Sequence, residues 1–268
     1  MIRILSLGAG VQSSTLALMA AKGEVGPMPD CAIFADTGWE PKAVYDQLKW
    51  LVSVLPFPVH VVSSGNIRTD ALSGNIRTDA LSGNNTTMQR FAAIPWHMTK
   101  PDGTPAMGRR QCTSEYKLNP IKRKVVELCG GMRKAGQAEM WVGISIDEIS
   151  RMRPSRVGYI VNRFPLIENE MSRNACLGWM DRHGFPAPPK SSCIGCPYHS
   201  DEQWRALTKD EFADAVEVDK AIRNQPKFRA QQFVHRQRIP LSDVDLSTAE
   251  ERGQVNLFEN ECEGMCGL

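Results

Sequence analysis

The sequence lacks any long uninterrupted run of apolar residues, and this absence excludes a membrane-spanning helix. Its apolar stretches are broken well short of the roughly 20 residues that crossing a bilayer requires. A large charge imbalance is also missing, since 32 Lys and Arg face 30 Asp and Glu, for a net charge of +2. This balance gives no overall electrostatic reason to expect a nucleic-acid-binding or membrane-surface protein. We therefore expect a soluble globular protein with no membrane partner.

The N-terminus does not have the pattern of a secretory leader. Arg3 and the apolar residues after it are followed by Gly8, Gly10 and Gln12, which interrupt the apolar core that a signal peptide needs. We therefore expect a cytoplasmic protein whose eight cysteines are reduced. In that compartment, closely spaced cysteines indicate a metal, an iron–sulfur cluster or redox chemistry rather than a disulfide framework.

Strand and helix patterns alternate along the first 200 residues. Strands are expected at 1–7, 30–35, 58–62 and 139–146, and helices at 13–22, 42–55, 121–134 and 170–183. This alternation predicts an α/β fold, a doubly wound parallel sheet with helices on both faces. Residues 201–238 have a helical pattern and 240–268 have no clear period. We expect one α/β domain over residues 1–200 and a helical segment with a cysteine-bearing tail over 201–268.

A tandem duplication lies in this first part of the chain. Residues 64–72, SGNIRTDAL, recur unchanged at 73–81. We interpret the copy as a lengthened surface loop or an extended helix, because closing a longer loop adds little entropic cost. A functional repeat is the alternative. Periodicity then fades over residues 88–120, where we expect a long active-site loop.

A turn of small residues separates the first expected strand from the first expected helix. The run Gly8-Ala9-Gly10 ends the strand, and hydroxyls at Ser13 and Ser14 open the helix. Such a turn lets backbone N–H groups approach a phosphate, and the positive end of the helix attracts the anion. The run matches neither a Walker A loop nor the GxGxxG dinucleotide motif. A turn that only packs the helix on the strand is the alternative.

Two segments resemble a known family. GAGVQSS, residues 8–14, resembles the PP-loop SGGxDS of the adenine nucleotide alpha-hydrolase superfamily. ADTGWE, residues 35–40, resembles the DTG segment of its 3'-phosphoadenosine 5'-phosphosulfate (PAPS) reductase branch. The resemblance implies a Rossmann-like adenine nucleotide site, with Asp36 and Thr37 near the adenosine. It implies that the phosphate or sulfate is surrounded by Ser6, Gly8, Ala9, Gly10, Gln12, Ser13 and Ser14.

The PP-loop motif has an aspartate where this chain has Gln12. A carboxylate is a good ligand for the Mg²⁺ that accompanies ATP, and a neutral amide is a poorer one. The sulfonucleotide reductases carry a similar G-x-Q in their modified loop. The substitution therefore favours binding of a sulfonucleotide over the splitting of ATP.

Two cysteine segments extend the resemblance. Cys193 and Cys196 form a CxxC before Pro197, and Cys112 follows Arg109 and Arg110, as in cluster-bearing family members with R-x-C-x4-K-x2-P and CxxCP. The resemblance implies a [4Fe–4S] cluster. Because the CC pair of these reductases is missing at position 112, the expected ligands are Cys112, Cys176, Cys193 and Cys196. Structural zinc and simple redox or packing cysteines are the alternatives.

The sequence ends in a segment with two further cysteines, Cys262 and Cys266. It resembles the ECGLH tail of the reductases, in which the cysteine attacks the sulfonate sulfur, although the histidine is absent here. The resemblance implies that Cys266 is the catalytic nucleophile, since a thiolate near Arg or Lys is activated for attack. A Cys262–Cys266 redox pair and a tail without a role are the alternatives.

Basic residues gather in two places. Residues 109–134 hold eight Lys or Arg against two Glu. We expect Arg109, Arg110 and Arg151 to bind the acidic end of the nucleotide, because the guanidinium fork matches phosphate and sulfate oxygens. A solvated helix face is the alternative for 121–134. The arginines near Arg151 are Arg153, Arg156, Arg163 and Arg173.

These expectations together define an enzyme like PAPS or adenylyl sulfate reductase. It would release sulfite and an adenosine phosphate, with a thioredoxin-like protein as electron donor. A second hypothesis is an ATP-dependent, iron–sulfur-dependent enzyme that inserts sulfur into tRNA or DNA, for which the single Cys112 and the basic segment argue. A third hypothesis is a noncatalytic nucleotide-sensing module.

Overall fold

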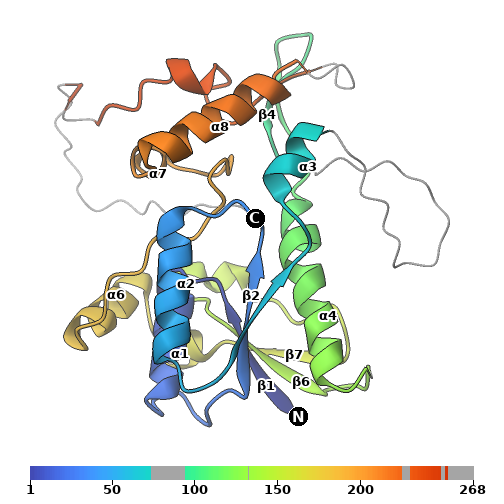
Figure 1. Ribbon diagram of the computed structural model, residues 1–268, viewed down its shortest axis with the longest axis vertical. Coiled ribbons are helices and arrows are strands. Elements are labelled where there is room, and N and C mark those ends of the chain that lie inside the picture. The colour runs from blue at the N-terminus through green and yellow to red at the C-terminus, as the bar shows by residue number, and fades with distance from the viewer. Residues whose placement is uncertain (74–93, 132, 225–229, 249–250, 253–268) are drawn as a thin grey trace. The chain divides into compact units, whose positions relative to one another are not determined.

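The computed structural model describes residues 1–73, 94–131, 133–224, 230–248 and 251–252 (Figure 1). The chain divides into two compact units. The first comprises Met1–Ser64 and Ser114–Ser192, and the second comprises Gly65–Thr113 and the described part of Cys193–Leu268. From the sequence we expected one domain over residues 1–200 and a helical segment over 201–268. That division stays a prediction.

The first unit is built on a five-stranded sheet in the order β3-β2-β1-β6-β7, in which every neighbouring pair is parallel. β1 lies at the centre, and its Leu5 pairs with Ala32 of β2 and with Trp141 of β6. The predicted parallel α/β sheet is confirmed. The strands are β1 (Ile2–Leu7), β2 (Cys31–Asp36), β3 (Val59–Ser63), β6 (Ala138–Val142) and β7 (Ile160–Arg163).

Helices cover both faces of this sheet. Successive residues of a strand point to opposite faces, so Leu5 joins the core beneath α1 and α2, while Ile4 joins the core beneath α4. Figure 1 shows α1 and α2 on one side of the strands and α4 on the other. The sheet is therefore doubly wound, as predicted. The helical segments of this unit are α1 (Val11–Ala21), α2 (Lys42–Val54), α4 (Asn119–Leu128), η2 (Ile146–Arg151), α5 (Pro165–Glu168) and α6 (Arg173–Arg182).

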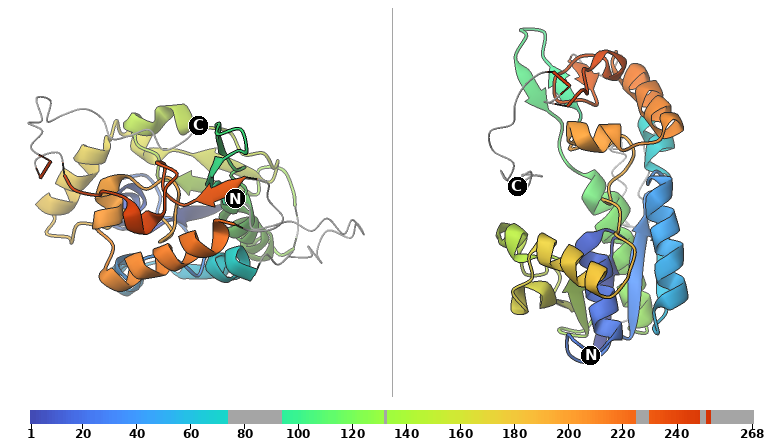
Figure 2. Two further views of the ribbon diagram at one scale, coloured as in Figure 1. Left: turned by 90° about the horizontal axis from the view of Figure 1, so that it is seen from above. Right: turned by 90° about the vertical axis from the view of Figure 1, so that its left-hand side faces the viewer.

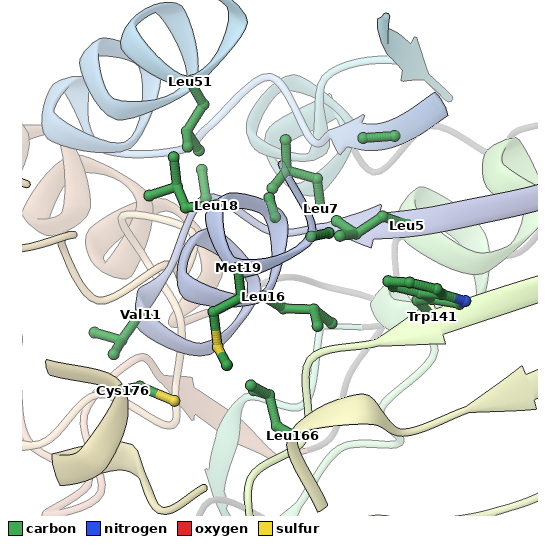
Figure 3. Close-up of a cluster of buried hydrophobic side chains, with 14 of the residues drawn as sticks. Leu5, Leu7, Val11, Leu16, Leu18, Met19, Leu51, Trp141, Leu166 and Cys176 are labelled. Carbon is green, nitrogen blue, oxygen red and sulfur yellow. The ribbon is translucent and has the colours of Figure 1, made fainter. Parts of the chain in front are cut away.

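The larger core of this unit lies between the sheet and α1. Leu5 and Leu7 of β1 pack with Leu16 of α1, and Trp141 of β6 and Leu166 of α5 close the cluster (Figure 3). α1 is buried along most of its length. This packing fixes the start of α1 at the carboxyl end of β1.

The second unit contains a small antiparallel sheet in the order β5-β4-β8 and several helices. α3 packs against α8 (Figure 2), where Arg68 contacts Asp214 over 2.5 Å and Glu217 over 2.7 Å. Its elements are α3 (Ile67–Ser73), β4 (His97–Thr99), β5 (Pro105–Met107), α7 (Asp201–Arg205), α8 (Lys209–Ile222), β8 (Gln231–Phe233) and η3 (Leu241–Asp243).

Two expectations from the sequence are wrong in detail. Residues 88–120 contain β4, β5 and the π-helical turn η1 (Thr113–Leu118) rather than loop alone, and the expected helical run to residue 238 ends at Ile222 and is followed by β8. The strands β4, β5 and β8 have three residues each, so they are too short to show a period. None of the described helices combines the length and apolar content that a membrane crossing needs.

Candidate functional site

The turn between β1 and α1 forms a loop closed by a hydroxyl group. The Gly8 N–H donates to Oγ of Ser13 over 3.1 Å, and this hydroxyl donates to the Gly10 carbonyl over 3.4 Å. Ala9 has a φ of +53°, in the left-handed region. The first turn of α1 contains no acidic residue. Because the first N–H groups of a helix have no acceptor within it, this loop presents donors and partial positive charge.

The end of β6 approaches the start of α1 closely. A Cβ on Gly143 would lie 3.0 Å from both Cα and N of Ser13 and 3.2 Å from the carbonyl carbon of Gln12. Gly143 therefore allows the two loops to meet. The strand order reverses between β1 and β6, and ligands of open α/β sheets bind outside the carboxyl ends of the strands at such a point.

The segment that follows α6 also packs against the loop. A Cβ on Gly10 would lie 3.2 Å from Cβ of Ser191 and 3.7 Å from the carbonyl oxygen of Pro189. The glycine at position 10 thus makes room for this segment. Three separate parts of the chain, 8–14, 143–148 and 189–191, meet at one place.

The Gln12 side chain belongs to a polar network. Its Nε2 donates to Glu148 over 3.4 Å, and its Oε1 accepts from the Arg173 guanidinium over 3.4 Å. Arg151 forms an ion pair with Glu148. The charges of Glu148 and Arg151 therefore offset each other beside Gln12, and Arg151 is engaged with a carboxylate at the place where we expected a nucleotide contact.

Asp36 stabilises the turn after β2. One of its carboxylate oxygens accepts from the Gly38 N–H and from the Tyr45 hydroxyl, each over 2.8 Å. Burial and the hydrogen bond to Asp36 raise the pKa of Tyr45 above its usual value. The carboxylate thus ties the turn to α2.

Thr37 is buried rather than open to a ligand. Its hydroxyl donates to Oε1 of Glu40 over 3.0 Å, and Nζ of Lys117 lies 3.3 Å from the same oxygen. The Glu40 side chain is only 1% exposed. Thr37 and Lys117 therefore stabilise a buried carboxylate at the end of β2.

The structure brings the predicted loop residues together. Ser6 is the next-to-last residue of β1 and is partly buried. Ser14 is fully buried, and its hydroxyl has no hydrogen-bond partner among the described residues. The residues on this loop are Ser6, Gly8, Ala9, Gly10, Gln12, Ser13 and Ser14, and Asp36 and Thr37 follow the neighbouring strand.

Arg109 and Arg110 belong to the second unit, whereas Arg151 belongs to the first. The side chains of Arg109 and Arg110 are exposed. Nε of Arg110 donates to the Thr113 hydroxyl over 3.2 Å, and its guanidinium lies 5.0 Å from the ring centre of Tyr198. The anion role of these two residues stays a prediction.

Arg163, one of the arginines grouped near Arg151 in the sequence, has internal partners. Its guanidinium forms an ion pair with Glu168 over 2.7 Å and lies 4.8 Å from the ring centre of Trp141. This geometry combines a salt bridge with a cation–π contact. Arg163 therefore stabilises the edge of the sheet.

The predicted cluster ligands are divided between the two units. Cys112, Cys193 and Cys196 belong to the second unit, and Cys176 belongs to the first. In the CxxC turn, the Cys196 N–H donates to the Cys193 carbonyl over 3.0 Å. Within the described ranges, no three His, Cys, Asp or Glu side chains form a group that could hold a metal ion. The iron–sulfur cluster and the zinc alternative therefore stay predictions.

Cys176 lies in the hydrophobic core of the first unit. It is 0% exposed and is grouped with Val11, Met19 and Leu166 (Figure 3). Burial raises the pKa of its thiol from 9.0 to about 11. Metals bind the thiolate, so this environment favours a neutral packing thiol.

The proposed nucleophile Cys266, its neighbour Cys262 and the second copy of the duplicated segment lie outside the described residues, apart from Ser73. Sequence reasoning missed Gly143, Glu148 and Ser191 as parts of the loop site. The glycine inside the strand expected over 139–146 could have indicated the first. Nothing in the local sequence marks the partners of the other two.

The fold and these loops define an α/β unit with a candidate anion site at the carboxyl edge of its sheet. No protein-family model matches the chain, and no curated protein sequence does. Among solved structures, the chain is similar to a phosphoadenylyl-sulfate (PAPS) reductase from Candida auris, crystallised as a phosphate complex. The two are 14% identical with a TM-score of 0.44, over 70% of this chain and 75% of that one.

Proposed function

We propose that the first unit binds the acidic end of an adenine nucleotide and that the chain acts on a sulfonucleotide, PAPS or adenylyl sulfate. The observation that carries the proposal is the meeting of the Gly8–Gly10 loop with Gly143 where the strand order reverses. The first turn of α1, whose backbone N–H groups would donate to the anion, contains no acidic side chain. That the ligand is an adenine nucleotide is inferred from the resemblance of residues 8–14 to the PP-loop.

The contacts of Gln12 favour a sulfonucleotide over ATP with Mg²⁺. Its Oε1 accepts from Arg173, a cation, and its Nε2 donates to Glu148. The amide oxygen is thus directed to a positive charge, and the nearby carboxylate is paired with Arg151. Mg²⁺ requires oxygen ligands in octahedral geometry, usually with a free carboxylate.

In the proposed reaction, the thiolate of Cys266 attacks the sulfur of the nucleotide's sulfonate group. A new S–S bond forms, the bond from that sulfur to the phosphate oxygen breaks, and AMP or adenosine 3',5'-bisphosphate leaves. A dithiol donor of the thioredoxin type then attacks Sγ of Cys266. Sulfite leaves, the donor is oxidised to a disulfide, and the Cys266 thiol is restored.

The bond changes of this reaction need no metal. The iron–sulfur cluster that the resemblance implies stays a separate prediction, and of its expected ligands Cys176 lies in the core of the first unit. The roles of Arg109, Arg110 and Arg151 as contacts of the phosphate or sulfate stay part of the proposal.

The test is incubation of the anaerobically purified chain with PAPS, adenylyl sulfate or Mg–ATP, in the presence of thioredoxin and its reductase. We expect sulfite together with AMP or adenosine 3',5'-bisphosphate. Cys266→Ser should abolish sulfite release, and Cys262→Ser, the matched control in the same segment, should retain it. Release of pyrophosphate from ATP would instead support the sulfur-insertion hypothesis, and binding without any product would support a sensing module.

A further inference from the structure

The chain between α6 and the CxxC turn lies directly against the glycine loop. Cβ of Ser191 is 3.2 Å, and its backbone N is 3.5 Å, from the position that a Cβ on Gly10 would occupy. Pro188, two residues before Lys190, is buried, and Pro189 precedes that lysine. Because proline fixes φ, this segment is held in place before any ligand binds.

Two hydroxyl groups converge beside Gly8. The position that a Cβ on Gly8 would occupy lies 3.6 Å from Oγ of Ser13 and 4.0 Å from Oγ of Ser191. The Ser13 hydroxyl is already engaged in closing the loop. The Ser191 side chain is partly exposed, so its hydroxyl can turn toward a ligand above the loop.

We propose that Ser191 is a ligand of the bound anion and that it completes the loop site beside Gly8 and Gly10. This inference rests on the proposed function and deepens it. The site would bind the phosphate or phosphosulfate end of an adenosine compound through hydroxyl and backbone N–H donors. A hydroxyl that donates to a charged oxygen contributes more than one that donates to a neutral group.

A purely structural role for Ser191 is the competing explanation, because its Cβ packs on Gly10. Ser191→Ala separates the two roles, since alanine keeps the Cβ and removes only the hydroxyl. Ser53→Ala is the control, because Ser53 is exposed near the end of α2 and its hydroxyl donates to the Trp50 carbonyl.

The experiment is calorimetric titration of the wild-type chain and both variants with adenylyl sulfate, AMP, adenosine and inorganic sulfate. We expect Ser191→Ala to bind adenylyl sulfate and AMP about ten- to a hundredfold more weakly, the effect of losing one hydrogen bond to a charged group. Its affinity for adenosine, which has no anion, should be unchanged, and Ser53→Ala should match the wild type throughout.

Each other outcome decides against a specific claim. Wild-type affinity for adenylyl sulfate in Ser191→Ala would overturn the inference and leave the proposed function standing. Equal losses for adenosine and adenylyl sulfate would overturn it too, because they would show a structural role. If the wild type binds sulfate but no nucleotide, the proposed function fails, and the sulfate affinity of Ser191→Ala still decides the inference. If the wild type binds neither, both are overturned.

Discussion

Gly143→Ala is the sharpest test of how the loop site is assembled. The added Cβ would lie 3.0 Å from Cα and N of Ser13, where ordinary van der Waals contacts of a Cβ are 3.4–4 Å. The atoms in conflict belong to the backbone, so no side-chain rotation can relieve the overlap. The start of α1 and the end of β6 must separate by a few tenths of an ångström.

The expected cost follows from this overlap. Overpacking of this kind destabilises proteins by about 1–3 kcal/mol. For a domain of this size, each kcal/mol lowers the melting temperature by roughly 2–4 °C. A cost of about 2 kcal/mol should therefore lower the melting temperature by about 4–8 °C. Because the N–H donors at the start of α1 move as well, affinity for adenylyl sulfate should fall at least about tenfold.

The assay is calorimetric melting together with nucleotide titration, and Gly158→Ala is the matched control. A Cβ added at Gly158 would meet no heavy atom within 4 Å, and this glycine has no positive φ, so its substitution should change stability by less than about 0.5 kcal/mol. If Gly143→Ala has the same melting temperature as the control and binds nucleotide like the wild type, the close approach of β6 to α1 is not required for the site.

Three further predictions concern the rest of the chain. Arg68→Ala should lower the free energy of urea unfolding by about 1 kcal/mol, because its ion pairs with α8 are partly buried, whereas Lys42→Ala, which removes an exposed ion pair with Asp46, should cost less than about 0.5 kcal/mol. Asp219→Asn should cost about 3 kcal/mol in the same assay, since this buried carboxylate pairs with an arginine and accepts two backbone N–H groups. Burial raises the pKa of Cys31 and Cys176 from 9.0 to about 11. These thiols therefore favour the folded state below about pH 9, and this contribution to stability is lost as the pH rises toward 11. Replacing both cysteines with alanine should make the free energy of unfolding decline less steeply over this alkaline range.

The sheet was predictable because its pattern is local. Ile4 and Leu5 follow each other in a short apolar run, and a glycine turn and a largely apolar helix come next, which is sufficient to predict a strand, a turn and a helix. The parallel arrangement then follows from repeated alternation of strands and helices, whereas β7 and the order of the strands were not predicted. The loop Gly8–Gly10 was found for the same reason, since all of its residues are adjacent in sequence.

The remainder of the site was not predictable because its contacts join distant positions. Gly143 matters through its distance to Ser13, and Ser191 through its distance to Gly10. The local sequence offers at most the glycine itself for Gly143 and no signal for Ser191. Cys176 shows the reverse case, since a cysteine assigned as a ligand from a sequence pattern lies among core residues, and its role as a ligand stays a prediction.

The electrostatics of the loop explain why the amino-acid composition of the chain gave no indication of an anion-binding site. Arg151 pairs with Glu148, and Arg173 donates to Gln12, so these two arginines near the loop already have partners. The remaining attraction comes from backbone N–H groups at the start of α1 and from hydroxyls, none of which contributes to net charge. A chain with a net charge of +2 can therefore present a strong local anion site. It follows that removing the Ser191 hydroxyl or displacing the start of α1 should weaken anion binding more than neutralising Arg173.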